Sequence, residues 1–330
     1  MTLQDDYLAI REGAAIGAVA PHRQIAVAGK DRATYLQGLL TNDIPALVPG
    51  SGCYAAWLTP QGRMLTDMHV LESGGMILLD VPADTAQATL DRLEQFIFTE
   101  DVRVGSLDTL TGVWIHGPKA PDVLERVFLA LSGLATWPEY RHTQSEFGEH
   151  PVSLARIDQL GVAGFCIYVE RAQEEHVIAA LMREGASLVS PDAIETARVE
   201  ACYPIFGVDM TDDTIPLEAG IEDRAISLTK GCYVGQEVII RVLHRGHGRV
   251  VRKLVGLRIG GPSPSRGARL FAGTREVGFI TSAAESPRLG TIALGYVHRD
   301  FVVAGTTLEA DGTAGRTPAT VTERLILSGA

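Results

Sequence analysis

The chain has 330 residues, 46% of them hydrophobic and 21% charged, a composition typical of a soluble globular protein with roughly two or three domains. Its net charge of −11 argues against direct binding to nucleic acid, because sequence-independent binding depends on basic surface. No apolar run approaches the ~20 residues that cross a bilayer. The acidic N-terminus is unlike a signal peptide, so we expect no membrane partner and a cytoplasmic location.

The first part of the chain predicts strands followed by single helices. Residues 25–29 are predicted to form a short strand, and "KDRATYLQGLL" after them has helical spacing of its apolar residues, with Asp31 as the N-cap. Residues 53–73 and 74–81 predict strands of a meander joined by "PQG" and "SGG". An amphipathic helix is expected to start near residue 83.

A second unit repeats this organisation without repeating the sequence. Residues 111–117 predict a strand and 118–131 a helix. A strand pair is expected within residues 150–170, followed by an amphipathic helix over 171–186. Single helices between short strands favour α+β lobes with mostly antiparallel sheets.

After residue 250 the pattern changes to short strands broken by Gly, Pro and Ser, with no segment of helical period. This pattern predicts an all-β barrel or sandwich. We therefore expect two α+β lobes within 1–249, divided approximately at 1–110 and 111–249, and a barrel over 250–330.

The four cysteines are far apart in sequence and show no CxxC spacing. In a cytoplasmic protein they are expected to be reduced thiols. Zinc sites and iron–sulfur clusters usually show close cysteine pairs, so the spacing disfavours a four-cysteine site. The four are Cys53, Cys166, Cys202 and Cys232.

The stretch "TKGCYVGQEVIIR", residues 229–241, places one of these cysteines in a turn. Gly231 and Gly235 give the turn backbone freedom, and a helix is expected from Gln236. Cys232 then lies about one turn before the positive helix end, with Lys230 nearby, which would lower the pKa of its thiol. The alternative is a tight turn with a buried, inert cysteine, and the residues alone leave both open.

A basic run follows in "RVLHRGHGRVVRK", residues 241–253. Such a run is often a solvated face, and here it could also be an anion site for a carboxylate or phosphate. His244 and His247 have spacing that metal ligands can use, but Gly246 between them disfavours a rigid pair.

Upstream of the turn, "ARVEACYPIFGVDMTDDTIPLEAGI" contains acids that need partners if they are buried. Arg198 could pair with Glu200 or Glu218, whereas Asp212 and Asp213 are interpreted as an acidic turn. "AVAGKDRA" lacks the first glycine of a phosphate loop, because residue 24 is glutamine, so nucleotide binding there is excluded.

"KGCYVGQE", residues 230–237, resembles the signature of the YgfZ-type folate-binding proteins, relatives of the mitochondrial iron–sulfur assembly factors. "VAGKDRATYLQGLLTNDI", "IHGPKAPDVL", "RVEACYPIFGVDM", "IPLEAGI" and "VGFITSAAESPRLGTIALGYV" follow the order of the wider glycine-cleavage T-protein (aminomethyltransferase) superfamily. The resemblance covers nearly the whole chain.

This resemblance implies a three-domain α+β cloverleaf, in which two interleaved lobes with antiparallel sheets and a C-terminal β-barrel surround a central channel. It implies binding of tetrahydrofolate or a derivative. It also implies support of [4Fe–4S] cluster assembly or repair, with iron–sulfur assembly machinery or client enzymes such as tRNA-thiolating enzymes as partners.

The sequence departs from the aminomethyltransferases at their functional positions. Their pterin-binding glutamate corresponds to Cys166, and an arginine of theirs to Ile194. No residue of "LLDVPADTAQATLDRL" is assigned to their catalytic aspartate. These departures favour the assembly-factor branch and leave a folate-dependent aminomethyl or one-carbon transferase, or a folate-sensing module without chemistry, as alternatives.

On the assembly-factor reading, Cys232 is the working group, as a nucleophile or a transient iron ligand, and Lys230 tunes its thiolate. Further residues are expected to support the turn or to lie beside the folate carboxylates. Others are expected to contact the folate itself. The supporting residues are Gly231, Tyr233, Gly235, Gln236, Glu237 and Arg241, and the expected folate contacts are Arg198, Glu200, Glu218 and Arg245.

Overall fold

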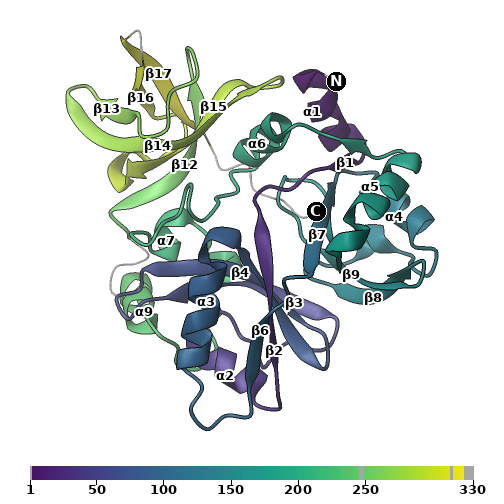
Figure 1. The fold of residues 1–330 in the computed structure, drawn as a ribbon. Helices are drawn as coiled ribbons and strands as arrows, with labels where there is room; N and C mark the ends of the chain where they lie inside the picture. The colour runs from purple at the N-terminus through teal and green to yellow at the C-terminus, as the bar shows by residue number, and fades with distance from the viewer. Residues whose placement is uncertain (1, 245–248, 313–314, 323–330) are drawn as a thin grey trace.

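The computed structural model describes residues 2–244, 249–312 and 315–322. Figure 1 shows two mixed α+β lobes beside a C-terminal barrel, which confirms the predicted fold class. Within the described ranges, no helix is both long and apolar enough to cross a bilayer.

The first lobe is built on a five-stranded antiparallel sheet in the order β3-β4-β5-β2-β6. Helices α2 (Arg32–Leu39) and α3 (Ala83–Gln95) pack apolar side chains on one face of it, as predicted. Asp31 does not cap α2 with its side chain, because its carboxylate accepts the amide hydrogen of Asp101 instead, at 2.8 Å. The strands are β2 (His22–Ala28), β3 (Ser51–Leu58), β4 (Met64–Glu72), β5 (Met76–Pro82) and β6 (Arg103–Ser106).

The second lobe carries a six-stranded sheet in the order β11-β1-β7-β10-β9-β8, antiparallel except for the short β1–β11 pair. Helices α4 (Ala120–Val127) and α5 (Glu174–Arg183) cover its outer face. The strands are β1 (Ala15–Ile16), β7 (Leu110–His116), β8 (His142–Phe147), β9 (His150–Arg156), β10 (Gly164–Glu170) and β11 (Ser187–Leu188).

The two sheets share a core through their remaining faces. Tyr54 and Leu78 of the first sheet belong to the same buried cluster as Trp114 and Tyr168 of the second. Side chains alternate between the two faces of a strand, so each strand of the first sheet has one set under its helices and one set toward the second lobe. This shared face is where polar groups from both lobes meet.

The lobes interleave in sequence. β1 lies in the second sheet although it precedes β2, and α1 (Leu3–Glu12) packs on α6 (Pro191–Glu200). After α6 the chain returns to the first lobe, where α8 (Glu222–Ala225) contacts β3. The remaining helices are α7 (Pro216–Ala219), α9 (Gln236–His244) and the 3₁₀ turns η1 (Leu134–Thr136), η2 (Arg171–Gln173) and η3 (Arg299–Phe301).

The C-terminal strands close into a barrel in the order β12-β15-β14-β13-β16-β17, at the upper left of Figure 1. Its interior is filled by aliphatic side chains such as Leu257, Leu270 and Leu308. The strands are β12 (Arg252–Ile259), β13 (Arg269–Ala272), β14 (Arg275–Ser286), β15 (Gly290–His298), β16 (Thr307–Gly312) and β17 (Gly315–Thr322). We propose the domain division near residue 250 on this arrangement.

Candidate functional site

The turn before α9 exposes its cysteine. Helix α9 begins at Gln236 as predicted, and Cys232 is exposed to solvent four positions earlier. Cys53 is partly buried, and Cys166 and Cys202 are buried, so Cys232 is the most accessible thiol of the four. Burial raises the pKa of the Cys53 thiol to about 12. The burial that the inert alternative assumed for Cys232 is therefore wrong, while its chemical role stays a prediction.

Lys230 holds the turn to the first lobe. Its Nζ donates to the carbonyl oxygens of Gln37, Leu40 and Asn42 at 2.7, 2.5 and 2.8 Å. An ammonium group has three hydrogens, so these bonds use all of them and leave none for a thiolate. The structure thus gives Lys230 an anchoring role, and its predicted tuning of Cys232 stays a prediction.

The two glycines of the turn differ. Gly235 has φ +84°, and a Cβ there would lie 2.5 Å from the carbonyl oxygen of Thr59. Gly231 has no positive φ, and a Cβ there would meet nothing within 4 Å. The backbone freedom predicted for both is required only at Gly235. Of the other supporting residues, Tyr233 is buried under Lys230, Gln236 is partly buried, and Glu237 and Arg241 are exposed.

We expect Gly235→Ala to lower the free energy of unfolding by about 1–3 kcal/mol, because it forces a backbone clash in a strained conformation. Gly231→Ala is the matched control and should stay within about 0.5 kcal/mol of the parent protein. Urea denaturation of the three proteins measures the difference. Equal stability of the two variants would contradict the placement of the turn against Thr59.

Arg198 and Glu200 have different partners, although the sequence suggested that they pair. Residues two apart on a helix point in different directions. Glu200 accepts from Arg11 at 2.6 Å and from Tyr7 at 3.0 Å, whereas Arg198 donates to Asp209 at 2.7 Å. Both residues are buried where α6 meets the barrel or α1. Glu200 connects α6 to α1, and Arg198 connects α6 to Ser282 of the barrel. Both residues lie outside the polar centre described below.

Of the two other expected folate contacts, only Glu218 lies within the described residues. Glu218 forms an ion pair with Arg252, with Oε2 and Nε 3.2 Å apart, at the start of the barrel. Arg245 and His247, with the side chain of His244, lie outside the described residues. The anion-site alternative for the basic run therefore stays a prediction.

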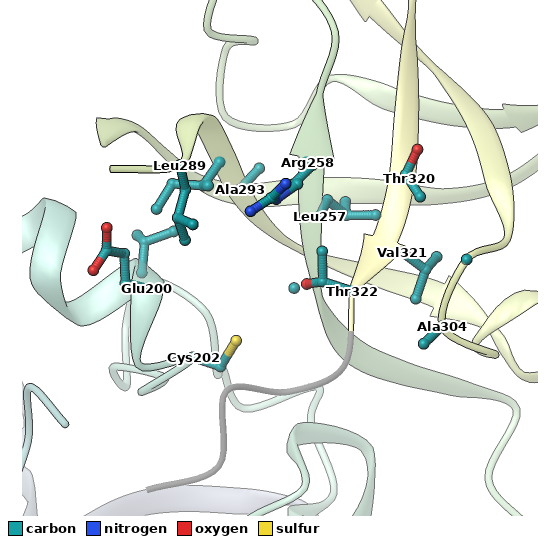
Figure 2. Close-up of a pocket in the computed structure, with 14 residues that line it drawn as sticks. Glu200, Cys202, Leu257, Arg258, Leu289, Ala293, Ala304, Thr320, Val321 and Thr322 are labelled. Atoms are coloured by element: carbon teal, nitrogen blue, oxygen red, sulfur yellow. The ribbon is translucent and has the colours of Figure 1, made fainter. Parts of the chain in front are cut away.

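A pocket of about 410 Å³ lies between the end of α6 and the barrel. Figure 2 shows Glu200 and Cys202 on its α6 side and Leu257, Val321 and Thr322 on its barrel side, with Arg258 extending from β12 toward the α6 side. Its walls are mostly apolar, and the carboxylate of Glu200 is held by the hydrogen bonds already described. Glu200 is therefore poorly placed to act as an acid or base there.

A row of polar side chains crosses the first sheet on the face that meets the second lobe. Tyr54 on β3 is directly opposite His69 on β4, His69 is opposite Asp80 on β5, and Asp80 is opposite Gln24 on β2. Asp67 and His22 lie two positions before His69 and Gln24, on the same face. We call six of these and one residue from the second lobe the central cluster: His22, Gln24, Tyr54, Asp67, His69, Asp80 and Gln159.

Short hydrogen bonds connect the central cluster. Asp80 accepts from Gln24 at 2.9 Å and from Tyr168 of β10 at 3.1 Å, and its Oδ2 lies 3.1 Å from Nδ1 of His22. Tyr54 donates to Asp67 at 2.5 Å. The cluster is therefore held by both sheets.

The surroundings shift the pKa values of the two buried carboxyl groups, Asp67 and Asp80, in opposite directions. Burial raises the pKa of Asp67 above its usual value, and Tyr54 only partly opposes this effect. Burial acts in the same sense on Asp80, but His22 outweighs it and holds the pKa of Asp80 below its usual value. Burial lowers the pKa of His69 to about 3, so this imidazole is neutral near pH 7. Paired groups with opposite shifts are typical of acid–base centres.

Two acceptor oxygens of the cluster have no hydrogen-bond partner, Oε1 of Gln24 and Oε1 of Gln159. A cavity of about 20 Å³ lies beside Gln159, His69 and Asp67, walled on another side by residues 203–206. Gln159 lines this cavity, and because buried acceptors normally have partners, its unpaired oxygen points to a bound group.

His116, buried on β7 beside Trp114, predicts a pH dependence of stability. Burial lowers its pKa to about 4. Between pH 7 and pH 5 the unfolded chain takes up a proton there and the folded chain does not, so acid favours unfolding by about 2 kcal/mol. We expect His116→Gln to remove this part of the loss, measured by denaturation at both pH values. His176→Gln, at an exposed position, is the control, and an unchanged loss in His116→Gln would refute the assignment.

The sequence interpretation missed the central cluster. Its signal is present in the sequence, because "TDMHV" and "LLDVP" place ionisable residues inside otherwise apolar strands. Cys166, expected to replace a pterin-binding glutamate, is buried on β10 in the core shared by the sheets. Burial raises the pKa of this thiol well above its usual value, so it is a poor nucleophile there.

Comparison with known proteins gives matches over most of the chain. Residues 1–230 match the family described as the GCVT N-terminal domain, and residues 252–326 match the glycine cleavage T-protein C-terminal barrel domain. An aminomethyltransferase of Desulforamulus reducens is 29% identical over 312 residues, which are 91% of this chain and 83% of that protein.

Two further proteins extend the comparison. A chloroplastic protein of Arabidopsis thaliana that carries a transferase name is 28% identical over 86% of this chain, and the match spans only 65% of its length. The crystal structure of the glycine cleavage system aminomethyltransferase T from Bartonella henselae has the same fold, with a TM-score of 0.87 at 24% identity. That superposition covers 98% of this chain and 89% of the other.

Proposed function

Because this chain belongs to the glycine cleavage T-protein family, we propose that it binds tetrahydrofolate and transfers one-carbon units, with the central cluster as its reaction centre. The predicted superfamily is thus confirmed, and its YgfZ-type branch stays a prediction. The observation that carries the proposal is Asp67, a buried carboxyl group with a raised pKa that lies beside a cavity lined by the unpaired acceptor of Gln159. The relatives named above as aminomethyltransferases support this reading over the iron–sulfur role.

The hydrogen-bond acceptors and aromatic rings of the central cluster suit a pterin. The amino and ring N–H groups of a pterin need acceptors, and the cavity wall offers a carboxyl oxygen of Asp67 and Oε1 of Gln159. Tyr54 and Trp114 present aromatic faces in the same core. These residues would hold the ring system, and the bound folate would supply the nitrogen that accepts the carbon unit.

The small volume of the cavity beside the central cluster limits how tetrahydrofolate can bind there. A cavity of about 20 Å³ accommodates one water-sized group, far below the ~300 Å³ or more of ordinary ligand sites. Residues 203–206 form one wall of it. We therefore expect tetrahydrofolate to bind only when this segment moves outward.

Asp67 is the proposed acid–base group. Tyr54 donates to its Oδ2, which leaves Oδ1 to carry the proton that burial favours. A buried carboxyl group with a raised pKa can give this proton to a departing amine and take one back. His69 lies two positions along the same strand and is neutral, so it adds no positive charge that would lower the pKa of Asp67.

Gln159→Leu tests folate binding at this centre. Removing the unpaired acceptor should weaken tetrahydrofolate binding at least about tenfold, because a ligand N–H loses its buried partner. Isothermal titration of the purified protein measures the affinity. Gln144→Leu, at an exposed position of β8, is the control. No binding by the parent protein, or equal binding by Gln159→Leu, would rule out the site.

Support of [4Fe–4S] assembly or repair is the second candidate function, and the exposure of Cys232 favours it. An accessible thiol can attack an electrophile or ligate iron together with groups from an assembly partner, whereas one cysteine cannot hold a four-thiolate cluster. The other three thiols are less accessible.

Complementation separates this candidate from the first. In a deletion strain under oxidative stress, Cys232→Ala should fail to restore [4Fe–4S] enzyme activity, and Cys53→Ala should restore it. Tetrahydrofolate binding should be the same in both variants. Full rescue by Cys232→Ala would eliminate the iron–sulfur role of this residue.

A further inference from the structure

Three members of the central cluster have the chemistry of a metal site. His22, His69 and Asp80 each offer one ligand atom, and these atoms lie within 4.8 Å of one another. We propose that His22, His69 and Asp80 bind one divalent transition-metal ion, such as Zn²⁺ or Fe²⁺. This site goes beyond the proposed function, because it requires no folate.

The sheet brings these ligands together on rigid elements. His69 and Asp80 are directly opposite on β4 and β5, and His22 comes from β2, the next strand in the sheet. The exposed fractions of His69 and Asp80 are 2% and 0%. The imidazole rings of His22 and His69 stack with centroids 5.7 Å apart. Ligands on neighbouring strands keep their spacing without help from a loop.

Two imidazoles and one carboxylate are a common ligand set for zinc and for non-haem iron. Ligand atoms about 2.1 Å from a tetrahedral ion are about 3.4 Å from one another. Nδ1 of His22 and Oδ2 of Asp80 are 3.1 Å apart, which is already close to this value. The ligand atom of His69 lies at most 4.8 Å from the other two and must move closer to them. Small side-chain rotations therefore suffice.

The neighbours of the ligands orient them as outer residues of metal sites do. Gln24 and Tyr168 donate to Asp80 at 2.9 and 3.1 Å and fix its carboxylate. The hydroxyl oxygen of Tyr140 lies 3.4 Å from Nδ1 of His69, where it can accept that proton and leave Nε2 unprotonated. A neutral imidazole is the form that binds metal.

The adjoining cavity provides the open coordination position. It is lined by His22, His69 and Gln159, and at about 20 Å³ it has room for one water molecule or ion. Gln159 is 3% exposed, and its Oε1 has no hydrogen-bond partner. That oxygen can accept a hydrogen bond from a metal-bound water. The unpaired oxygen and the ligand spacing are independent observations that point to the same group.

Titration with Co²⁺ and Zn²⁺, without folate, tests the site. The full chain, first treated with a chelator, should bind one equivalent of Zn²⁺ by elemental analysis. Bound Co²⁺ should give visible ligand-field absorption without the thiolate charge-transfer band that binding at a cysteine produces. His69→Gln and Asp80→Asn should each weaken binding at least tenfold, and His176→Gln should bind as the parent does.

Circular dichroism and thermal unfolding check that the variants fold, and His22→Asn replaces any that does not. Less than 0.1 equivalent of metal in the parent protein would overturn the proposal. So would a thiolate band, or unchanged binding in folded His69→Gln and Asp80→Asn. Because tetrahydrofolate is absent from this titration, its outcome does not depend on the proposed one-carbon transfer.

Discussion

Asp67→Asn is expected to lower the rate of tetrahydrofolate-dependent transfer from an aminomethyl donor by about 10²–10⁴-fold. Asparagine has nearly the same shape and can still accept the hydrogen bond from Tyr54. It cannot take up or release the proton that burial favours on the carboxyl group. The loss should therefore fall on kcat, and tetrahydrofolate binding should change much less.

Single-turnover and steady-state formation of methylenetetrahydrofolate by the purified protein measure this effect. Asp122→Asn, at an exposed position in the first turn of α4, controls for the loss of one negative charge. Turnover by Asp67→Asn at the parental rate would exclude Asp67 as the acid–base group. Tight folate binding by the parent protein without any turnover would exclude the transferase and favour a folate-sensing module.

Arg198→Met should lower the free energy of unfolding by about 3–5 kcal/mol. Arg198 and Asp209 are both 0% exposed in their side chains, and the guanidinium also donates to Tyr203 O, Glu195 and Ser282. Methionine fills much of the space but leaves the Asp209 charge buried without its counterion. The bond to Ser282 of β14 means that the barrel loses a contact to α6 as well.

Arg269→Met is the matched control, because Arg269 and Glu276 form an ion pair exposed by 63% and 50% on the barrel surface. Exposed pairs contribute about 0–1 kcal/mol, so this variant should unfold close to the parent in urea. Adding Asp209→Leu to Arg198→Met should recover part of the loss. A loss in Arg198→Met no larger than in Arg269→Met would contradict the structural role of Arg198.

Local patterns predicted the elements well. Hydrophobic period and turn residues, both read within a few positions, were enough to predict several elements. These are the helix from residue 83, the helix from Gln236 and the short strands after residue 250. The same local reasoning placed the turn before α9. It did not distinguish Gly231 from Gly235, because the requirement at Gly235 comes from Thr59, far away in sequence.

The candidate site depends on strand register, which single-sequence patterns do not contain. His69 meets Asp80 and Tyr54 only because β3, β4 and β5 pair with a particular alignment, and a shift by one residue would turn each side chain to the other face. The partners of Glu200 and Lys230 are likewise distant in sequence, as is Ser282, one of the partners of Arg198. Sequence reasoning could identify buried polar residues, but it could not assign their partners.

A crystal structure of this chain with tetrahydrofolate tests the central claim most directly. We expect the pterin ring within hydrogen-bonding distance of Asp67 and Gln159, with residues 203–206 displaced from the wall that they form around the cavity. Tetrahydrofolate bound in the pocket between α6 and the barrel, with the central cluster unchanged, would contradict the claim.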